Sequence, residues 1–270
     1  MVPQPDRRRP AAAGTGGGGA GVITRAQPWL GTLVEISADS DAAIDAGFAA
    51  IARVHRALNA HDRGSELSHA NRNAPHQPVR LSRMAAAVIG RAQFWAARSD
   101  GAFDASAGHW RAVQLTGRTL RYAVPLALDL SGIAKGFAVD RAVVALRRTG
   151  TRHGLVNAGG DMRGFGAAWP VSLVRPDRAP VAKITLHDAS LATSALRPDG
   201  SDDHLRGLAR GIVSASVECR RAIDADALAK IVAGGGPRVA ACLDTVGAVA
   251  LVIGAGGELT QIGNPDRLAA

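Results

Sequence analysis

A short segment from residue 128 to residue 140 constrains this chain most, because it combines apolar residues, closely spaced glycines and a lysine. It reads Leu-Asp-Leu-Ser-Gly-Ile-Ala-Lys-Gly-Phe-Ala-Val-Asp. The pattern predicts an apolar strand that runs through a glycine turn into a helix carrying Lys135. Backbone N–H groups at a helix start and a nearby ammonium favour an anionic ligand, and Gly132 and Gly136 let the backbone approach it closely. An ordinary strand-to-helix connection has the same pattern, so the neighbouring segments must decide.

The chain has 270 residues, enough to bury a full core, and it shows no internal linker between residues 25 and 263. Residues 1–22 are arginine-, alanine- and glycine-rich, and we expect them to form a disordered tail before a single domain at 23–270. The tail lacks the leucine-rich core of an export signal, and no apolar run is long enough to span a membrane. A cytoplasmic protein without an integral membrane segment is therefore the expectation.

The charge balance raises the question of a nucleic-acid partner. The net charge is +9 and the isoelectric point is about 11.0. The arginines are scattered rather than arranged along one element, and few aromatic residues are present to stack on bases. A general preference for arginine explains the charge, so we expect no nucleic acid. Cys219 and Cys242 lack metal-site spacing and are expected to be buried free thiols.

Periodicity predicts a mixture of helices and strands. Helices are expected from Asp39 or Ser40 to Leu58, from Ser82 to Arg98, over 134–149, and from Asp224 to Gly234. Strands are expected at 32–37, 128–130, 153–157, 169–174, 183–186, 190–193, 212–217, 249–253 and 258–262. The irregular alternation favours an α+β layered domain with antiparallel or mixed sheets over a doubly wound one. Neither a dinucleotide-binding glycine motif nor a P-loop is present.

Several polar segments are candidate ligand contacts. The stretch from His61 to Asn73 is predicted to be a polar loop that walls a ligand site. Residues 158–161, Ala-Gly-Gly-Asp, predict either a nest of N–H groups for an anion or a tight turn. Asp140 is expected on the outward face of the lysine helix. Carboxylates near the start of the helix that begins at Asp224 have a purely structural interpretation as dipole caps.

Seven segments in order resemble the ApbE family of FAD:protein FMN transferases, over about residues 28–263. The most specific is 129–140. The others are Leu-Gly-Thr at 30–32, Ser-Glu-Leu-Ser at 65–68 with Asn71, Gly-Ala-Phe-Asp at 101–104, Val-Asn-Ala-Gly-Gly-Asp at 156–161, Ala-Thr-Ser at 192–194, and Ala-Asp-Ala-Leu-Ala at 225–229.

This resemblance implies a single ApbE-like domain related to the T-fold, which binds FAD and uses Mg²⁺. It implies transfer of the FMN half of FAD to a threonine or serine hydroxyl of an acceptor protein, with release of AMP. The implied catalytic residues are His204, Lys135 and Asp226, and the implied metal ligands are Asp226 and the Ala134 carbonyl. The implied flavin contacts are Leu30, Ser68, Phe103, Asp104, Lys135, Asn157, Gly159, Gly160, Asp161, Thr193 and Ser194.

The chain departs from the family pattern at two places. Lys230 replaces a threonine that serves as a metal ligand in the family, and it lies four residues after Asp226. Its ammonium is therefore expected to point at Asp226 or at the metal position, which would weaken the metal or substitute for part of its charge. A solvated surface lysine is the alternative. Around His204, the family's Asp-Pro and Thr-Gly parts are missing, although the histidine itself suits proton transfer near neutral pH.

Two functional interpretations follow. The first is an FMN transferase acting on an acceptor protein. The second is a paralogue that binds FAD or another nucleotide without transferring it, an interpretation favoured by Lys230 and by the changed segment around His204.

Overall fold

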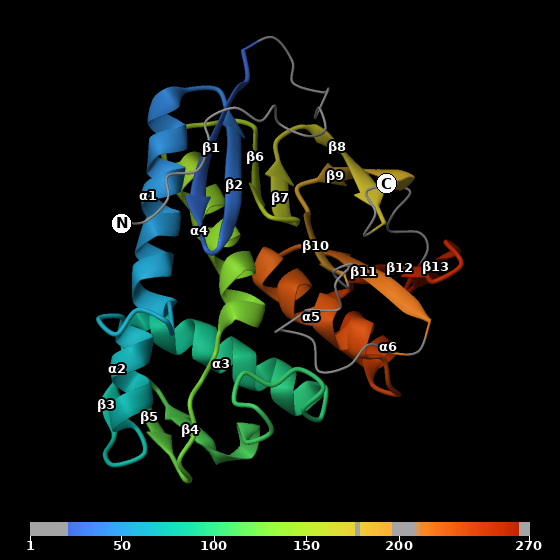
Figure 1. The fold of residues 1–270 in the computed structure, drawn as a ribbon. Helices are drawn as coiled ribbons and strands as arrows, with labels where there is room; N and C mark the ends of the chain where they lie inside the picture. The colour runs from blue at the N-terminus through green and yellow to red at the C-terminus, as the bar shows by residue number, and fades with distance from the viewer. Residues whose placement is uncertain (1–20, 176–178, 196–208, 210, 265–270) are drawn as a thin grey trace, which may run out of the picture.

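The computed structural model describes residues 21–175, 179–195, 209 and 211–264, and it is an α+β protein (Figure 1). A large sheet of eight strands forms its centre, in the order β1-β2-β6-β7-β10-β11-β12-β13, and all its neighbouring strands are antiparallel. The strands are β1 (Ile23–Trp29), β2 (Thr32–Ala38), β6 (Gly154–Ala158), β7 (Asp161–Phe165), β10 (Ser190–Ala195), β11 (Ile212–Cys219), β12 (Val249–Gly254) and β13 (Leu259–Ile262). The expected fold class is confirmed.

Three helices pack on one face of this sheet and form the main core with it. They are α1 (Asp41–Leu58), α4 (Ser131–Arg148) and α5 (Ala222–Gly234). The start of α1 follows from its sequence, because the Ser40 hydroxyl accepts a hydrogen bond from the Ala43 N–H at 3.3 Å. Apolar residues at helical spacing, such as Ile44 and Ile51, are then fully buried. This helix begins and ends as predicted.

The middle of the other face of the large sheet is covered by a two-stranded ribbon, β8 (Ala168–Val174) and β9 (Pro180–His187). A second, smaller apolar cluster lies between the ribbon and the sheet, and it includes Trp169, Leu186 and Leu191. The molecule therefore has helical, sheet and ribbon layers.

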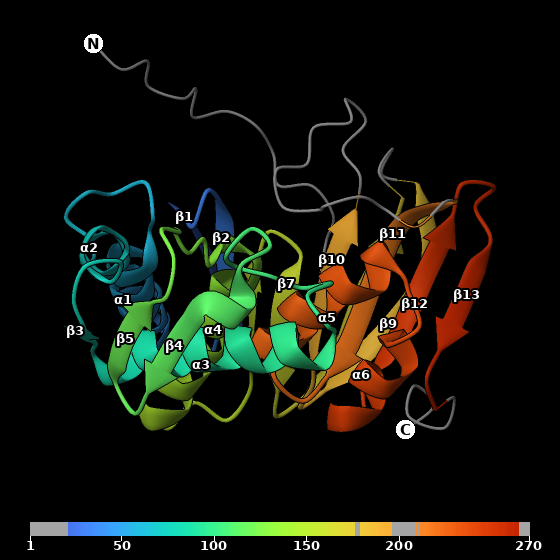
Figure 2. The ribbon, with the colours of Figure 1, turned by 90° about the horizontal axis from the view of Figure 1, so that it is seen from below.

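A smaller unit lies beside the helical layer. It consists of a three-stranded sheet in the order β3-β5-β4, together with α3, which passes beneath α4 and α5 (Figures 1 and 2). The elements of this unit are α2 (Glu66–Asn73), β3 (Val79–Arg80), α3 (Arg83–Arg98), a short 3-10 helix (Trp110–Ala112), β4 (Val113–Thr116) and β5 (Thr119–Tyr122). The last helix, α6 (Val239–Val246), packs against α5.

The prediction of a polar loop through Asn73 is wrong for its second half, which forms α2. The Ser65 hydroxyl accepts from the Ser68 N–H at 3.0 Å and caps this helix, and Leu67 and Ala70 are buried. The other residues of this segment are mostly polar, so its apolar face is narrow, and the sequence pattern did not indicate a helix.

Two predictions about the lysine helix also need correction. Residues 128–130 are irregular rather than a strand, and α4 begins at Ser131, so both glycines lie inside the helix. Asp140 is buried rather than outward, because its carboxylate binds the start of α5. Helix periodicity alone did not indicate that a second helix covers this side of α4.

The remaining predictions concern the two cysteines and the chain start. Cys219 and Cys242 are free and buried, as expected. The predicted tail lies outside the described residues up to residue 20, and β1 begins at Ile23. Within the described parts of the chain, none of the helices combines the length and apolar character needed to cross a membrane.

Candidate functional site

The candidate site lies where α4 and α5 cross. Gly136 makes the close crossing possible, because a Cβ at this position would lie 2.1 Å from the Ala222 carbonyl oxygen of α5. The Gly136 N–H donates to Asp226 Oδ2 at 2.9 Å, and Asp226 is fully buried. The glycine that sequence analysis assigned to a ligand contact thus serves first to bring a carboxylate against α4.

The second oxygen of Asp226 is bound by a lysine from the same helix. Lys230 Nζ lies 2.5 Å from Asp226 Oδ1 and 3.1 Å from the Asp226 carbonyl oxygen. The Lys230 side chain is only 10 % exposed, so the alternative of a solvated surface lysine is wrong. The predicted placement of Lys230 on the face of Asp226 is confirmed.

A second lysine–carboxylate pair stands beside the first. Lys135 of α4 forms an ion pair with Asp161, whose side chain is 2 % exposed. Burial raises the pKa of Asp161, the charge of Asp226 raises it further, and the ammonium groups of Lys135 and Lys230 oppose that shift. This mutual influence indicates that the four charged groups form one cluster, which we call the lysine–carboxylate cluster.

The turn before Asp161 is built from the predicted Ala-Gly-Gly-Asp segment. Gly159 and Gly160 have positive φ angles of 66° and 101°, and the Gly160 N–H donates to Asn157 Oδ1 at 3.0 Å. A Cβ at Gly159 would lie 2.4 Å from Thr32 Oγ1. Of the two alternatives, the structure shows a tight turn, and its effect is to hold Asp161 in the cluster.

Two cavities border the first turn of α4. The larger, of about 350 Å³, has mostly apolar walls and includes Lys135. The smaller, of about 190 Å³, includes Lys230 and lies on the other side. Asp129 and Ser131 line both, so the helix start separates them. The larger is lined by Leu30, Gly31, Val54, His55, Leu58, Asn59, Ala60, His61, Asp129, Ser131, Ala134 and Lys135, and the smaller by Ala102, Phe103, Asp104, Ala105, Ala107, Ala127, Asp129, Ser131, Gly132 and Lys230.

Phe103 and Asp104 shape the smaller cavity. Phe103 is buried, and its ring would lie 3.3 Å from a Cβ at Gly132, so it packs on the first turn of α4. Asp104 accepts hydrogen bonds from the Ser106 N–H, the Ser106 hydroxyl and the Gly108 N–H at 2.6 to 2.7 Å. Its carboxylate therefore fixes the loop in addition to lining the cavity.

Other expected site residues lie farther from these cavities. Ser68 is buried, and its hydroxyl donates to the carbonyl of Ala60, a residue in the wall of the larger cavity, at 3.0 Å. Thr193 shares a hydrogen bond of 2.8 Å with Ser216 across β10 and β11, and Ser194 is buried. His204 lies outside the described residues.

Two histidines line the larger cavity, and the sequence pointed only to His61, which begins the polar segment expected to wall a ligand site. His55 lies on α1 with its ring centroid 5.6 Å from that of Trp29, and His61 follows the end of the same helix. His55 follows Val54 within an amphipathic helix, and nothing in its sequence context distinguishes it from a surface residue.

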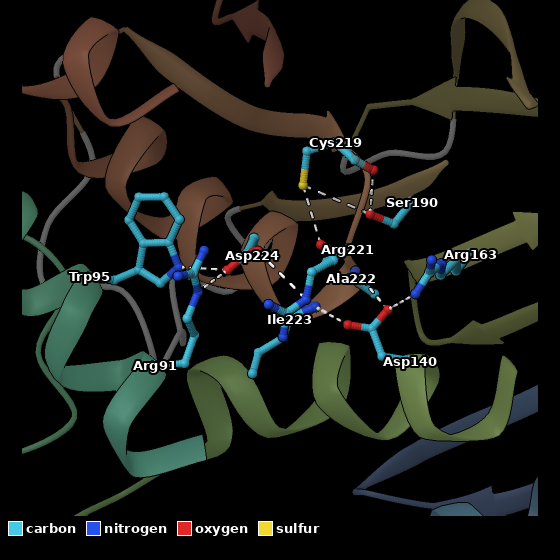
Figure 3. Close-up of polar contacts among 10 residues, drawn as sticks. All are labelled: Arg91, Trp95, Asp140, Arg163, Ser190, Cys219, Arg221, Ala222, Ile223 and Asp224. Atoms are coloured by element: carbon cyan, nitrogen blue, oxygen red, sulfur yellow. Dashed lines mark hydrogen bonds and ion pairs between the residues drawn. The ribbon is translucent and has the colours of Figure 1, made fainter. Parts of the chain in front are cut away.

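A network of polar contacts surrounds the start of α5, the helix that carries Asp226 (Figure 3). Asp140 Oδ1 accepts from the Ala222 N–H at 3.0 Å, and Oδ2 accepts from the Ile223 N–H at 3.1 Å. Asp140 also pairs with Arg163 at 2.5 Å. This carboxylate, contributed by α4, serves as the cap of α5 and locks the two helices together.

On the opposite side of α5, Asp224 binds α3. Its carboxylate is 2.5 Å from Arg91 Nε and accepts from the Trp95 Nε1–H at 3.0 Å (Figure 3). The cap interpretation of these carboxylates is thus only partly right, because Asp224 and Asp226 each bind a separate neighbouring group.

The donor set does not fit a resident Mg²⁺ ion. Such an ion requires near-octahedral oxygen ligands at about 2.0–2.1 Å. Both oxygens of Asp226 already accept from N–H or ammonium groups, and Lys230 places a positive charge beside the expected position. Across the described ranges, no group of three or more His, Cys, Asp and Glu side chains is placed to hold a metal.

The site therefore defines a layered α+β protein in which two cavities border the glycine-containing start of α4, one with Lys135 of α4 in its wall and the other with Lys230 of α5. The profile of the ApbE family matches residues 30–119 and 109–199, which together exceed half of the chain. The chain belongs to the ApbE family, and the expected resemblance is confirmed.

Solved structures support the same fold. The flavin transferase ApbE from Vibrio cholerae superposes with a TM-score of 0.79 at 22 % identity, over 90 % of this chain and 97 % of the other. The ApbE protein from Thermotoga maritima gives a TM-score of 0.81 at 23 % identity, over 92 % and 99 %. The Pseudomonas stutzeri flavinyl transferase ApbE gives 0.79 at 18 % identity, over 92 % and 97 %. No curated protein sequence matches the chain.

Proposed function

We propose that this protein transfers the FMN half of FAD to a threonine or serine hydroxyl of an acceptor protein and releases AMP. The observation that carries the proposal is the pair of cavities on either side of the α4 start, each with a lysine in its wall. FAD has two ring systems joined by a diphosphate. A diphosphate lying over the first turn of α4 would place one ring system in each cavity.

The chemistry requires screening of negative charge. The acceptor hydroxyl oxygen attacks the phosphorus next to riboflavin and forms a new P–O bond. The bond between that phosphorus and the bridging oxygen breaks, AMP leaves with that oxygen, and the hydroxyl proton passes to a base or to solvent. N–H groups at the start of a helix and fixed cations stabilise the charge that develops on the phosphoryl oxygens.

We assign the residues to roles within this proposal. Lys135 binds the diphosphate from the larger cavity, while Leu30 and Phe103 contact the rings. Asn157, Gly159 and Gly160 hold Asp161, and Asp161 orients Lys135. His204 remains the candidate for proton transfer. The expected use of Mg²⁺ is not part of this proposal, because the donor set around Asp226 does not fit the ion.

The second candidate function is binding of FAD without transfer. The observation that favours it is the Lys230–Asp226 pair, which occupies the carboxylate that the family resemblance assigns to a metal. In this case the protein would retain FAD but would never modify an acceptor.

One experiment separates the two functions. The purified protein is titrated with FAD by fluorescence and is then incubated with FAD and a protein bearing a flavinylation threonine. Saturable FAD binding followed by an FMN mass on the acceptor supports the transferase. Binding without modification supports the second function. Absence of flavin binding would refute both.

A further inference from the structure

Two of the three lysines in this chain belong to the lysine–carboxylate cluster. Lysine and arginine together number 32, and only Lys135, Lys183 and Lys230 are lysines. The chain uses arginine almost everywhere else, including the buried pairs with Asp140 and Asp224. The presence of two lysines close together in space is therefore a specific feature of the site. Lysine presents a point charge, whereas arginine presents a broad planar group.

Contacts along the side chain hold Lys230 in place. A Cβ at Gly132 would lie 3.1 Å from Lys230 Cε and 3.2 Å from Cδ. The lysine stem thus packs against the first turn of α4, where a glycine leaves room for it. Lys230 also lines the smaller cavity beside Asp129 and Ser131. Its charged end is fixed between a buried carboxylate and a space that a ligand can enter.

The charges of the cluster balance without any added ion. Asp161 and Asp226 contribute two negative charges, and Lys135 and Lys230 contribute two positive ones. A carboxylate as deeply buried as Asp226 requires a partner, and Lys230 provides one. A divalent cation at Asp226 would have to displace the ammonium and would leave two positive centres next to one another.

We propose that the Lys230 ammonium takes the place of a divalent cation, so that this protein binds the diphosphate of FAD without a metal. The ammonium compensates Asp226 and presents positive charge to the diphosphate from the smaller cavity, opposite Lys135. The proposal rests on the proposed function for the identity of the ligand. The claim that Asp226 holds no metal does not depend on that identity.

The first test needs no flavin. Mn²⁺ is added to the wild-type protein, and free Mn²⁺ is followed by electron paramagnetic resonance. We expect all the Mn²⁺ to remain free at micromolar concentrations. Stoichiometric binding that is abolished by Asp226→Asn would overturn the proposal, whether or not the protein binds FAD.

The second test measures FAD affinity in EDTA and in excess Mg²⁺. We expect the wild-type Kd to agree within twofold under the two conditions. Lys230→Met keeps the stem and removes the charge, and we expect it to weaken FAD binding at least tenfold in EDTA. The matched control is Lys183→Met, which removes the exposed lysine of β9 and should change the Kd less than twofold.

A wild-type Kd that weakens tenfold in EDTA, or a Lys230→Met variant that binds FAD as tightly as wild type, overturns the proposal. Lys230→Met leaves Asp226 buried without its partner. If this variant does not fold, the double variant Lys230→Met with Asp226→Asn restores neutrality and has the same expected loss of affinity. Complete absence of FAD binding by wild type contradicts the proposed function, and the Mn²⁺ measurement then decides the role of Lys230.

Discussion

Two carboxylates on α5, only two residues apart, have different partners. Asp224 faces α3 and binds Arg91 and Trp95, whereas Asp226 faces α4 and binds Lys230 and the Gly136 N–H. Residues at positions i and i+2 of a helix point to different sides, so this short segment of α5 can bind α3 on one side and α4 on the other. The Arg91 pair joins two helices, while the Lys230 pair borders a cavity.

The same contrast holds for the neighbouring pairs. Asp140 pairs with Arg163 and caps α5, and Asp161 pairs with Lys135 beside the larger cavity. Arginine forms several directed hydrogen bonds and suits a rigid contact between two elements, while lysine offers a compact charge that a ligand can also contact. We therefore regard the arginine pairs as structural and the lysine pairs as the functional part of the network.

The largest expected effect is on stability, from breaking an arginine pair. Asp140→Asn leaves Arg163 without its charge partner and weakens the cap of α5. We expect a loss of about 3–5 kcal/mol in the free energy of unfolding, measured by urea denaturation. The control is Asp188→Asn, which breaks the exposed pair with Arg147 and should cost less than about 1 kcal/mol. Equal effects of the two changes would contradict the structural role of Asp140.

The next effect tests the helix crossing that brings Asp226 to α4. In Gly136→Ala, the added methyl would meet the Ala222 carbonyl and Asp226 Cβ, so the helices must separate. We expect a loss of about 1–3 kcal/mol in stability and weaker FAD binding, because Asp226 and Lys230 move with α5.

The control for this crossing is Gly90→Ala within α3. The nearest atom to its Cβ would be Leu115 Cδ2 at 3.5 Å, an ordinary contact. We expect this change to stabilise the protein by about 0.5–1 kcal/mol. A Gly136→Ala variant as stable as Gly90→Ala would disprove the close crossing.

Breaking a lysine pair should have a smaller effect on stability and a clear effect on FAD binding. Lys135→Met removes the ammonium from the larger cavity, and we expect FAD affinity to fall about tenfold, or about 1.4 kcal/mol. Stability should change less than in Asp140→Asn, because the pKa of Asp161 is already raised by burial and by Asp226, and the carboxyl can take up a proton. Arg53→Met, at an exposed position on α1, should leave the affinity unchanged.

The smallest effect concerns a carboxylate with no ion-pair partner among the described residues. Burial raises the pKa of Glu218 on β11 from 4.5 to about 7. Below pH 4.5 both folded and unfolded chains hold the proton. Between pH 4.5 and 7 only the unfolded chain releases it, so stability falls as pH rises. After discounting for solvent screening, we expect the free energy of unfolding to fall by about 1 kcal/mol between pH 4.5 and pH 7.

Glu218→Gln tests this pH dependence directly. The variant should gain stability relative to wild type at pH 8 and show no such gain at pH 4. A constant difference between the two proteins across this range would exclude titration of Glu218 as the cause. The result would also show whether a partly buried carboxylate that has no ion-pair partner among the described residues responds to pH differently from the paired ones.

Much of the fold could be predicted from local sequence. Ser40 and Ser82 cap helices that run as expected, since a serine side chain satisfies N–H groups of the first turn. Helix α2 could not be recognised, because its apolar face is narrow and its length is only eight residues. Strands β3, β4 and β5 are very short, with two to four residues each. β4 and β5 pair with each other across a tight turn, and only β3 pairs with a more distant segment. Strands of this length show no clear alternation of apolar and polar residues.

For the candidate site, sequence similarity indicated the residues but not their arrangement. It brought Lys135, Asp161 and Asp226 to attention, and helical spacing correctly placed Lys230 on the side of Asp226. It could not show that Asp140 caps α5, because that contact joins residues about 80 positions apart, and local pattern carries no information about such pairs.

By itself, the sequence determined the serine caps of α1 and α3, most strands, the family and the presence of two lysines among the expected site residues. These features depend on neighbouring residues or on ordered motifs. Only the tertiary structure decided that the glycines of α4 admit α5 and that Lys230 shares the carboxylate of Asp226. The physical reason is burial, because a carboxylate removed from water must have a cation or N–H partner. The packing of α4 on α5 determines which partner is within reach.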